Sequence, residues 1–150
     1  MGSASGVGRE APTFVITAAD GSEINSKQYR GDWFPVLVFL STQAAETAAA
    51  LAQLSLAADK LWGLRGQLLG ICDAGRDEVK ALADRVEGLS FPLLPDDGSV
   101  AQAYSALKKN GEVRPMAFIV DRAGKIVWTG EGAPALEPAT LVAAFREVAR

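Results

Sequence analysis

The 150-residue chain has a single cysteine, Cys72, and no histidine. One cysteine cannot form a disulfide within the chain, and the lack of histidine rules out a thiol–imidazole pair and a Ser-His-Asp triad. Zinc sites built on cysteine and histidine are excluded for the same reason. The acidic residues lack the clustered spacing of a carboxylate metal site, so the sequence indicates no metal and no cofactor.

Basic residues are also in short supply, with 15 Lys and Arg against 18 Asp and Glu, a formal charge of −3 and a pI near 5.0. They are scattered singly or in pairs, which argues against nucleic acid and anionic membranes as partners. No apolar run is long enough to cross a bilayer, and the first residues lack the apolar core of a secretion signal. A cytoplasmic location is therefore expected.

The apolar content, 49%, is typical of one compact domain with one core. We expect a flexible lead over residues 1–8 and a single domain over residues 9–150. Continuous apolar runs at Pro35–Leu40 and Gln67–Cys72 predict strands buried on both faces of a sheet. Further strands are expected at Thr13–Thr17, Glu23–Ile24, Phe91–Leu94, Met116–Val120 and Lys125–Thr129, and helices at Gln43–Leu64, Arg76–Glu87, Ser99–Leu107 and Ala139–Ala149.

This alternation of strands and helices predicts an α/β fold: a central mixed sheet, helices on both faces and an N-terminal hairpin. Ser99 is expected to cap its helix, and Pro138 to open the last one. In the first long helix, four residues fall on one apolar stripe: Leu51, Leu54, Leu61 and Trp62. Trp62, with Trp33 and Trp128, is therefore expected to be a packing residue.

Four local patterns occur in a fixed order: Gly8-Arg-Glu-Ala-Pro-Thr-Phe14, Tyr29-Arg-Gly31 before Val36–Phe39, Phe91–Leu94 with Tyr104, and Arg114–Ile126. With the element order, they make the chain resemble the peroxiredoxins of the alkyl hydroperoxide reductase and thiol-specific antioxidant type, and related thioredoxin-like oxidoreductases. The resemblance implies a thioredoxin-like fold. It also puts Pro115 where such proteins have a cis proline facing the active thiol; the alternative is an ordinary trans proline.

The resemblance further implies cysteines that this chain does not have. Counted from Phe39, the thioredoxin-like register puts two cysteines at Ala44 and Thr47, and the peroxiredoxin register puts a threonine at Ala45 and the attacking cysteine at Ala48. Peroxide reduction needs a thiolate at this place. Thr47 cannot replace it, because no histidine is present to activate a hydroxyl.

Two more residues are candidates for the site. In peroxiredoxins an arginine from the strand after residue 114 holds the thiolate, and Arg114 lies one position before that place, so it either faces the pocket or is a solvated charge at the strand end. Cys72 ends a strand whose carboxyl end is expected at the same sheet edge. It is either a reactive thiol near the vacated pocket or a small buried apolar residue.

The main hypothesis is a peroxiredoxin-like protein that is redox-silent because alanine replaces the attacking cysteine. One alternative is an active thiol peroxidase or thiol-disulfide oxidoreductase that uses Cys72, or that is seen with cysteines changed to alanine by engineering rather than by natural loss. Another is a non-catalytic binding or assembly module. The expected partners are a second copy in a homodimer, or a protein or peptide at the old active-site edge around Ala44–Thr47, Arg114 and Pro115.

Overall fold

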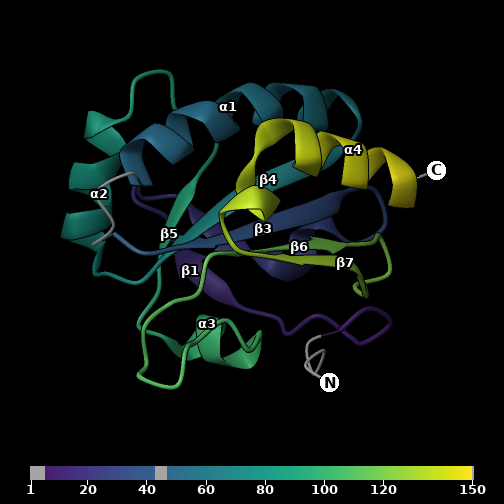
Figure 1. The fold of residues 1–150 in the computed structure, drawn as a ribbon, viewed down its shortest axis with the longest axis horizontal. Helices are drawn as coiled ribbons and strands as arrows, with labels where there is room; N and C mark the ends of the chain where they lie inside the picture. The colour runs from purple at the N-terminus through teal and green to yellow at the C-terminus, as the bar shows by residue number, and fades with distance from the viewer. Residues whose placement is uncertain (1–5, 43–46, 150) are drawn as a thin grey trace.

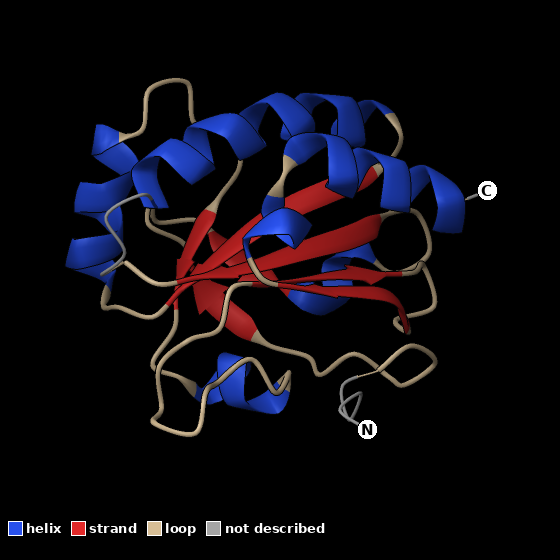
Figure 2. Cartoon of the chain, viewed as in Figure 1, coloured by secondary structure: helices blue, strands red, loops and turns tan. Residues whose placement is uncertain are grey.

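A five-stranded mixed sheet forms the centre of the computed structural model, which describes residues 6–42 and 47–149 (Figure 1). The strand order is β5-β4-β3-β6-β7. Helices α1 and α4 cover one face, α2 stands beside them, and α3 lies on the opposite face (Figure 2). The strands are β3 (Phe34–Leu40), β4 (Gly66–Cys72), β5 (Leu93–Pro95), β6 (Met116–Val120) and β7 (Ile126–Glu131), and the helices are α1 (Thr47–Gly63), α2 (Arg76–Arg85), α3 (Ser99–Ala103) and α4 (Pro138–Val148).

Strand β3 is buried over its whole length, as its apolar run predicts. It pairs in parallel with β4 and antiparallel with β6, so both of its edges are hydrogen-bonded, and its side chains pack into apolar clusters on both faces. The observed fold is the predicted thioredoxin-like α/β fold with a mixed sheet.

A small antiparallel hairpin precedes the sheet, formed by β1 (Val15–Thr17) and β2 (Glu23–Asn25). A short 3-10 helix, η2 (Ser26–Tyr29), follows it, and another, η3 (Ala133–Leu136), leads into α4; neither is predicted from the sequence. The chain is anchored as early as Gly8, whose N–H donates to the Ile126 carbonyl at 2.7 Å. Residues 1–5 of the expected flexible lead lie outside the described residues.

Two apolar clusters lie on the two faces of the sheet, because alternate strand residues point to opposite sides. Val36, Val38 and Leu40 join the cluster under α1 and α4. Leu37 and Phe39 join the other, in which the Tyr104 ring lies 5.5 Å from the Phe39 ring and 5.1 Å from the Phe118 ring. The second cluster packs the hairpin and α3 against the sheet.

The stripe predicted on α1 is correct for its leucines but wrong for Trp62. Leu51, Leu54 and Leu61 are fully buried, whereas Trp62 is 61% exposed. Successive residues of a helix point about 100° apart, so the orientation of α1 that buries Leu61 turns the Trp62 side chain toward solvent. There its ring lies 5.6 Å from the ring of Trp33.

Helix α3 is shorter than expected and is not capped by Ser99. Gly98 is the N-cap residue, and the backbone N–H groups of the first turn donate to the preceding aspartates. The helix ends at Ala103, because Ser105 takes a left-handed conformation (φ 59°) that a right-handed helix cannot continue. Leu107 belongs instead to an isolated bridge with Val113.

Candidate functional site

The carboxyl ends of β3, β4 and β5 meet at one edge of the sheet, together with the amino end of β6. Leu40 is paired with Cys72 on β4. The antiparallel register of β3 and β6, in which Phe39 faces Met116, puts Pro115 on the other side of Leu40. Cys72, Pro115 and the loop after β3 therefore lie together at one edge of the sheet, as the sequence predicts. Open α/β sheets usually bind ligands at this edge.

The loop after β3 is tied at both of its described ends. The Thr42 N–H donates to the Asp73 carboxylate at 2.9 Å, which links the loop to the end of β4. The Thr47 hydroxyl donates to the Ser41 carbonyl at 2.6 Å, which links the loop to the start of α1. Ala44 and Ala45, two of the vacated cysteine and threonine positions, lie outside the described residues.

The other two vacated positions, Thr47 and Ala48, are in the first turn of α1. Thr47 is only 3% exposed, and its hydroxyl is engaged as a hydrogen-bond donor. Ala48 is partly buried against the apolar cluster under α1. Neither side chain offers a nucleophile to a ligand at this edge.

Cys72 is fully buried in the same apolar cluster. Burial, and to a smaller extent the negative charge of Asp73, raises the pKa of the Cys72 thiol to about 12. The thiol is therefore protonated at neutral pH, and a protonated, inaccessible thiol is a poor nucleophile. These surroundings match those of a small apolar core residue.

Arg114 precedes β6 and forms an ion pair with Glu131 at the end of β7. The Arg114 side chain is 34% exposed and that of Glu131 is 63% exposed, so the pair lies at the surface of the edge. The Arg114 backbone is fixed as well, because its N–H donates to the Ala106 carbonyl at 2.7 Å. The guanidinium of Arg114 is thus at the predicted edge, where the Glu131 carboxylate, whose role was not predicted from the sequence, holds it.

Pro115 is not in the expected cis conformation. Among the described residues there is no cis peptide bond. The Pro115 carbonyl accepts a hydrogen bond from the Gly132 N–H at 2.8 Å, which joins the start of β6 to the segment after β7. Pro115 is a trans proline at the beginning of a strand, where its missing N–H costs no ladder hydrogen bond.

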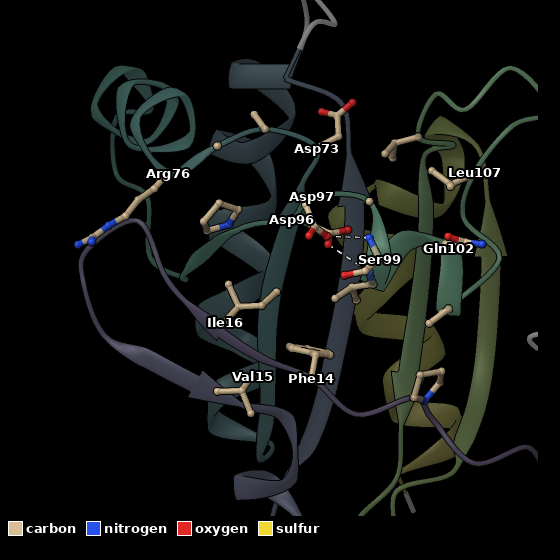
Figure 3. A pocket seen from close by; sticks show the side chains of 18 of the residues that line it. Phe14, Val15, Ile16, Asp73, Arg76, Asp96, Asp97, Ser99, Gln102 and Leu107 are labelled. Carbon is tan, nitrogen blue, oxygen red and sulfur yellow. Dashed lines mark hydrogen bonds between the residues drawn. The ribbon is translucent and has the colours of Figure 1, made fainter.

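A large open groove, of about 1320 Å³, lies beside this edge on the face that carries α3 (Figure 3). Its walls come from four parts of the chain: the segment Pro12–Thr17, the residues after β4, the turn after β5 with α3, and the loop of Leu107 and Val113. Asp73 lines the groove and also holds the loop after β3 through Thr42. No pattern in the sequence predicted this groove.

Neither a metal-binding cluster nor a membrane-spanning helix occurs in residues 6–42 and 47–149. No group of three or more His, Cys, Asp or Glu side chains there is arranged to hold a metal ion. None of the helices in that part is both long and apolar enough to cross a bilayer.

The mixed sheet and the helices that cover both of its faces define a thioredoxin-like α/β fold. The peroxidoxin BcpB of Mycobacterium tuberculosis superposes with a TM-score of 0.81 at 18% identity, over 95% of this chain and 97% of that one. The Enterococcus faecalis AhpC superposes with a TM-score of 0.80 at 17% identity, over 95% and 93% of the two chains. At these identities the likeness concerns the fold.

Sequence similarity identifies the family. The sequence profile of the AhpC/TSA family matches residues 7–129. A Mycobacterium tuberculosis protein that bears the name "Putative peroxiredoxin Rv2521" is 32% identical over 131 residues, which are 80% of this chain and 81% of that protein. The chain therefore belongs to the AhpC/TSA family, whose members form a thiol-dependent antioxidant and redox class.

Proposed function

We propose that this chain is a non-catalytic member of the AhpC/TSA family and does not reduce peroxides by the thiol mechanism. The observation that carries the proposal is the state of its only thiol: Cys72 is fully buried, and burial raises its pKa to about 12. A peroxidatic thiolate attacks a peroxide oxygen and becomes a sulfenic acid, while the other oxygen leaves as water or an alcohol. Neither the thiolate nor access for the peroxide is available at Cys72.

The vacated positions support the same proposal. Thr47 is buried and hydrogen-bonded, Ala48 packs on the core, and Arg114 is paired with Glu131 rather than with a thiolate. With one cysteine in the chain, a sulfenic acid could not be resolved to a disulfide within the same molecule. The fold of the family is thus present without the groups that carry out its reaction.

Restoring a cysteine tests whether the scaffold still supports catalysis. In the Ala48→Cys variant the new thiol lies in the first turn of α1, where the helix N-terminus stabilises a thiolate. Ala44→Cys tests the other register. A matched control is Ala49→Cys, whose thiol is at an exposed position of the same turn. Hydroperoxide consumption is measured for all three variants and for the wild-type chain.

The proposal predicts no peroxide consumption by the wild-type chain above that of Cys72→Ser. Turnover by the wild-type chain that is lost in Cys72→Ser would overturn it and would favour the alternative in which Cys72 is the reactive thiol. Activity of Ala48→Cys or Ala44→Cys above Ala49→Cys would show a catalytic scaffold that lacks only its sulfur. If neither gains activity, the idea of an active enzyme hidden by alanine substitutions fails.

A homodimer remains our proposal for the assembly, and family membership is what supports it. Light scattering tests it directly: a dimer has twice the 15.7 kDa mass of the chain, whereas a monomer at high concentration would contradict the proposal. A cytoplasmic location stays a prediction from the sequence.

A further inference from the structure

One edge of the β1–β2 hairpin has unpaired backbone groups. The Ala18 N–H donates to the Ser22 carbonyl, and the Ser26 N–H donates to the Phe14 carbonyl. The even-numbered residues along β1 therefore form the hydrogen bonds to β2. In an antiparallel pair the residues between them point their N–H and C=O groups the other way. Val15 and Thr17 therefore direct these groups away from β2.

The outward edge of this strand faces the groove. Ala19, two residues beyond Thr17 on the same edge, donates its N–H to the Leu93 carbonyl of β5 at 3.0 Å. The contact is not continued toward Thr17 by any further hydrogen bond within the described residues. Beyond that point β5 ends at Pro95, which has no N–H to donate, and both Val15 and Thr17 line the groove. The groove therefore begins where the contact between β1 and β5 ends.

The groove carries a negative charge. Three aspartates line it, Asp73, Asp96 and Asp97, against one arginine, Arg76. The Arg76 guanidinium lies against the turn at Gly21, and Figure 3 shows its side chain pointing away from Asp96 and Asp97. Asp97 is at the surface, where hydrogen bonds from Ser99 lower its pKa and keep it ionised. The accessible charge within the groove is thus acidic.

We propose that the groove binds an extended peptide segment with basic side chains from a partner protein, added as a strand to the open edge of β1. The N–H and C=O groups of Val15 and Thr17, which have no hydrogen-bond partner among the described residues, supply the backbone contacts of such a strand. Lysine or arginine at alternate positions of the segment would point toward Asp97 and Asp73, since strand side chains alternate between faces. The proposal does not depend on the absence of peroxidase activity.

Heptapeptide binding to the full chain tests this proposal, followed by NMR of the backbone amides at low salt. The probe is Lys-Val-Lys-Val-Lys-Val-Lys, with Glu-Val-Glu-Val-Glu-Val-Glu as the acidic counterpart. We expect the amide signals of Val15 and Thr17 to shift with the lysine peptide at up to millimolar concentration. The glutamate peptide should leave them unchanged.

Two variants separate the backbone contacts from the charge. Val15→Pro removes an outward N–H without removing a β1–β2 hydrogen bond, and it should weaken binding about fivefold, as the loss of one hydrogen bond does. Val15→Thr keeps the N–H and should bind like the wild-type chain. Asp97→Asn keeps the acceptor for the Ser99 N–H but loses the charge, so it should weaken binding about two- to fivefold, an effect that salt reduces.

Three results would overturn the proposal: no amide shifts at millimolar lysine peptide, equal shifts with the glutamate peptide, or wild-type affinity in both Val15→Pro and Asp97→Asn. Shifts at Val15 and Thr17 that depend on protein concentration without peptide would also overturn it, because the edge would then pair with a second copy. If Val15→Pro does not fold by circular dichroism, the charge dependence in Asp97→Asn and the two peptides decides the question.

Discussion

Cys72 shows how the surroundings of a residue decide its chemistry. The same side chain would be a nucleophile at a solvent-accessible, electropositive site, but here it lies in an apolar cluster next to the negative charge of Asp73. The sequence puts Cys72 at the end of the strand Gln67–Cys72, which lies beside the end of Pro35–Leu40 on the condition that the two strands are parallel, as they are in the structure. It could not show which face of β4 the thiol occupies, since that depends on the packing of α1.

The raised pKa of Cys72 predicts a dependence of stability on pH. The unfolded chain loses the thiol proton near the ordinary pKa of 9.0, whereas the folded chain keeps it up to about 12. Between these values the folded state binds more protons, so its stability falls as pH rises, by up to about 1.4 kcal/mol per pH unit. Urea unfolding above about pH 9 should therefore show a steeper loss of stability in the wild-type chain than in Cys72→Ala. Parallel pH profiles of the two proteins would contradict the assignment.

Thr47 offers a second test at the scale of one side chain. Replacing Thr47 with Val removes the buried hydroxyl that bonds to the Ser41 carbonyl, and should lower the free energy of unfolding by about 1–2 kcal/mol. The control is Thr42→Val, because the Thr42 hydroxyl lies at a long 3.4 Å from the Asp73 carboxylate while the Thr42 backbone N–H makes the shorter bond. Equal losses in the two variants, measured by urea unfolding, would refute this role of Thr47.

Among the elements, continuous apolar strands were predictable and short helices were not. β3 and β4 are recognisable because nearly every residue of such a run is apolar or small, whichever face it occupies; Gln67 near the start of β4 is the exception. Helix α3 depends on side chain to backbone hydrogen bonds from the turn before it, which compete with the capping role expected for Ser99. Trp62 is a similar case. It follows the core residue Leu61, and from the sequence alone its side chain could lie either on the buried apolar stripe of α1 or at the solvent-exposed border of that stripe.

Asp96 should be the principal cap of α3. Its two carboxylate oxygens accept the N–H groups of Val100 (3.1 Å) and Ala101 (3.0 Å), and the residue is 5% exposed. Asp96→Ala should destabilise the protein by about 2 kcal/mol, because two buried donors lose their partner. Asp97→Ala is the control and should have a much smaller effect, since the hydrogen bonds that Asp97 accepts from Ser99 are exposed to water. Comparable losses for the two variants in thermal unfolding would contradict this account.

At the scale of the whole molecule, the N-terminal segment is part of the core and not an appendage. The Tyr104 hydroxyl donates to the Pro12 carbonyl at 2.7 Å across 92 positions of sequence, and the Tyr104 ring lies among Phe39 and Phe118. The groove also arises only at this scale, because its walls come from segments far apart in sequence. No local pattern could predict it.

Tyr104→Phe keeps the ring and removes only this long-range hydrogen bond. We expect a loss of about 1–2 kcal/mol in the free energy of unfolding, with faster hydrogen exchange in the segment Pro12–Thr17. Tyr29→Phe is a matched control, since Tyr29 is buried and its hydroxyl has no hydrogen bond within the described residues. Unchanged exchange in Pro12–Thr17 would show that the segment is held by other contacts.

The central claim is that the family fold is present here without its thiol chemistry. Intact mass spectrometry of the native wild-type chain, treated with hydrogen peroxide and a sulfenic-acid trap, tests it most directly. The account predicts an unmodified 15.7 kDa chain in the native state, and reaction of Cys72 only when the protein is unfolded. A trapped adduct on Cys72 in the native protein, formed together with peroxide loss, would contradict the account and make the chain a thiol peroxidase.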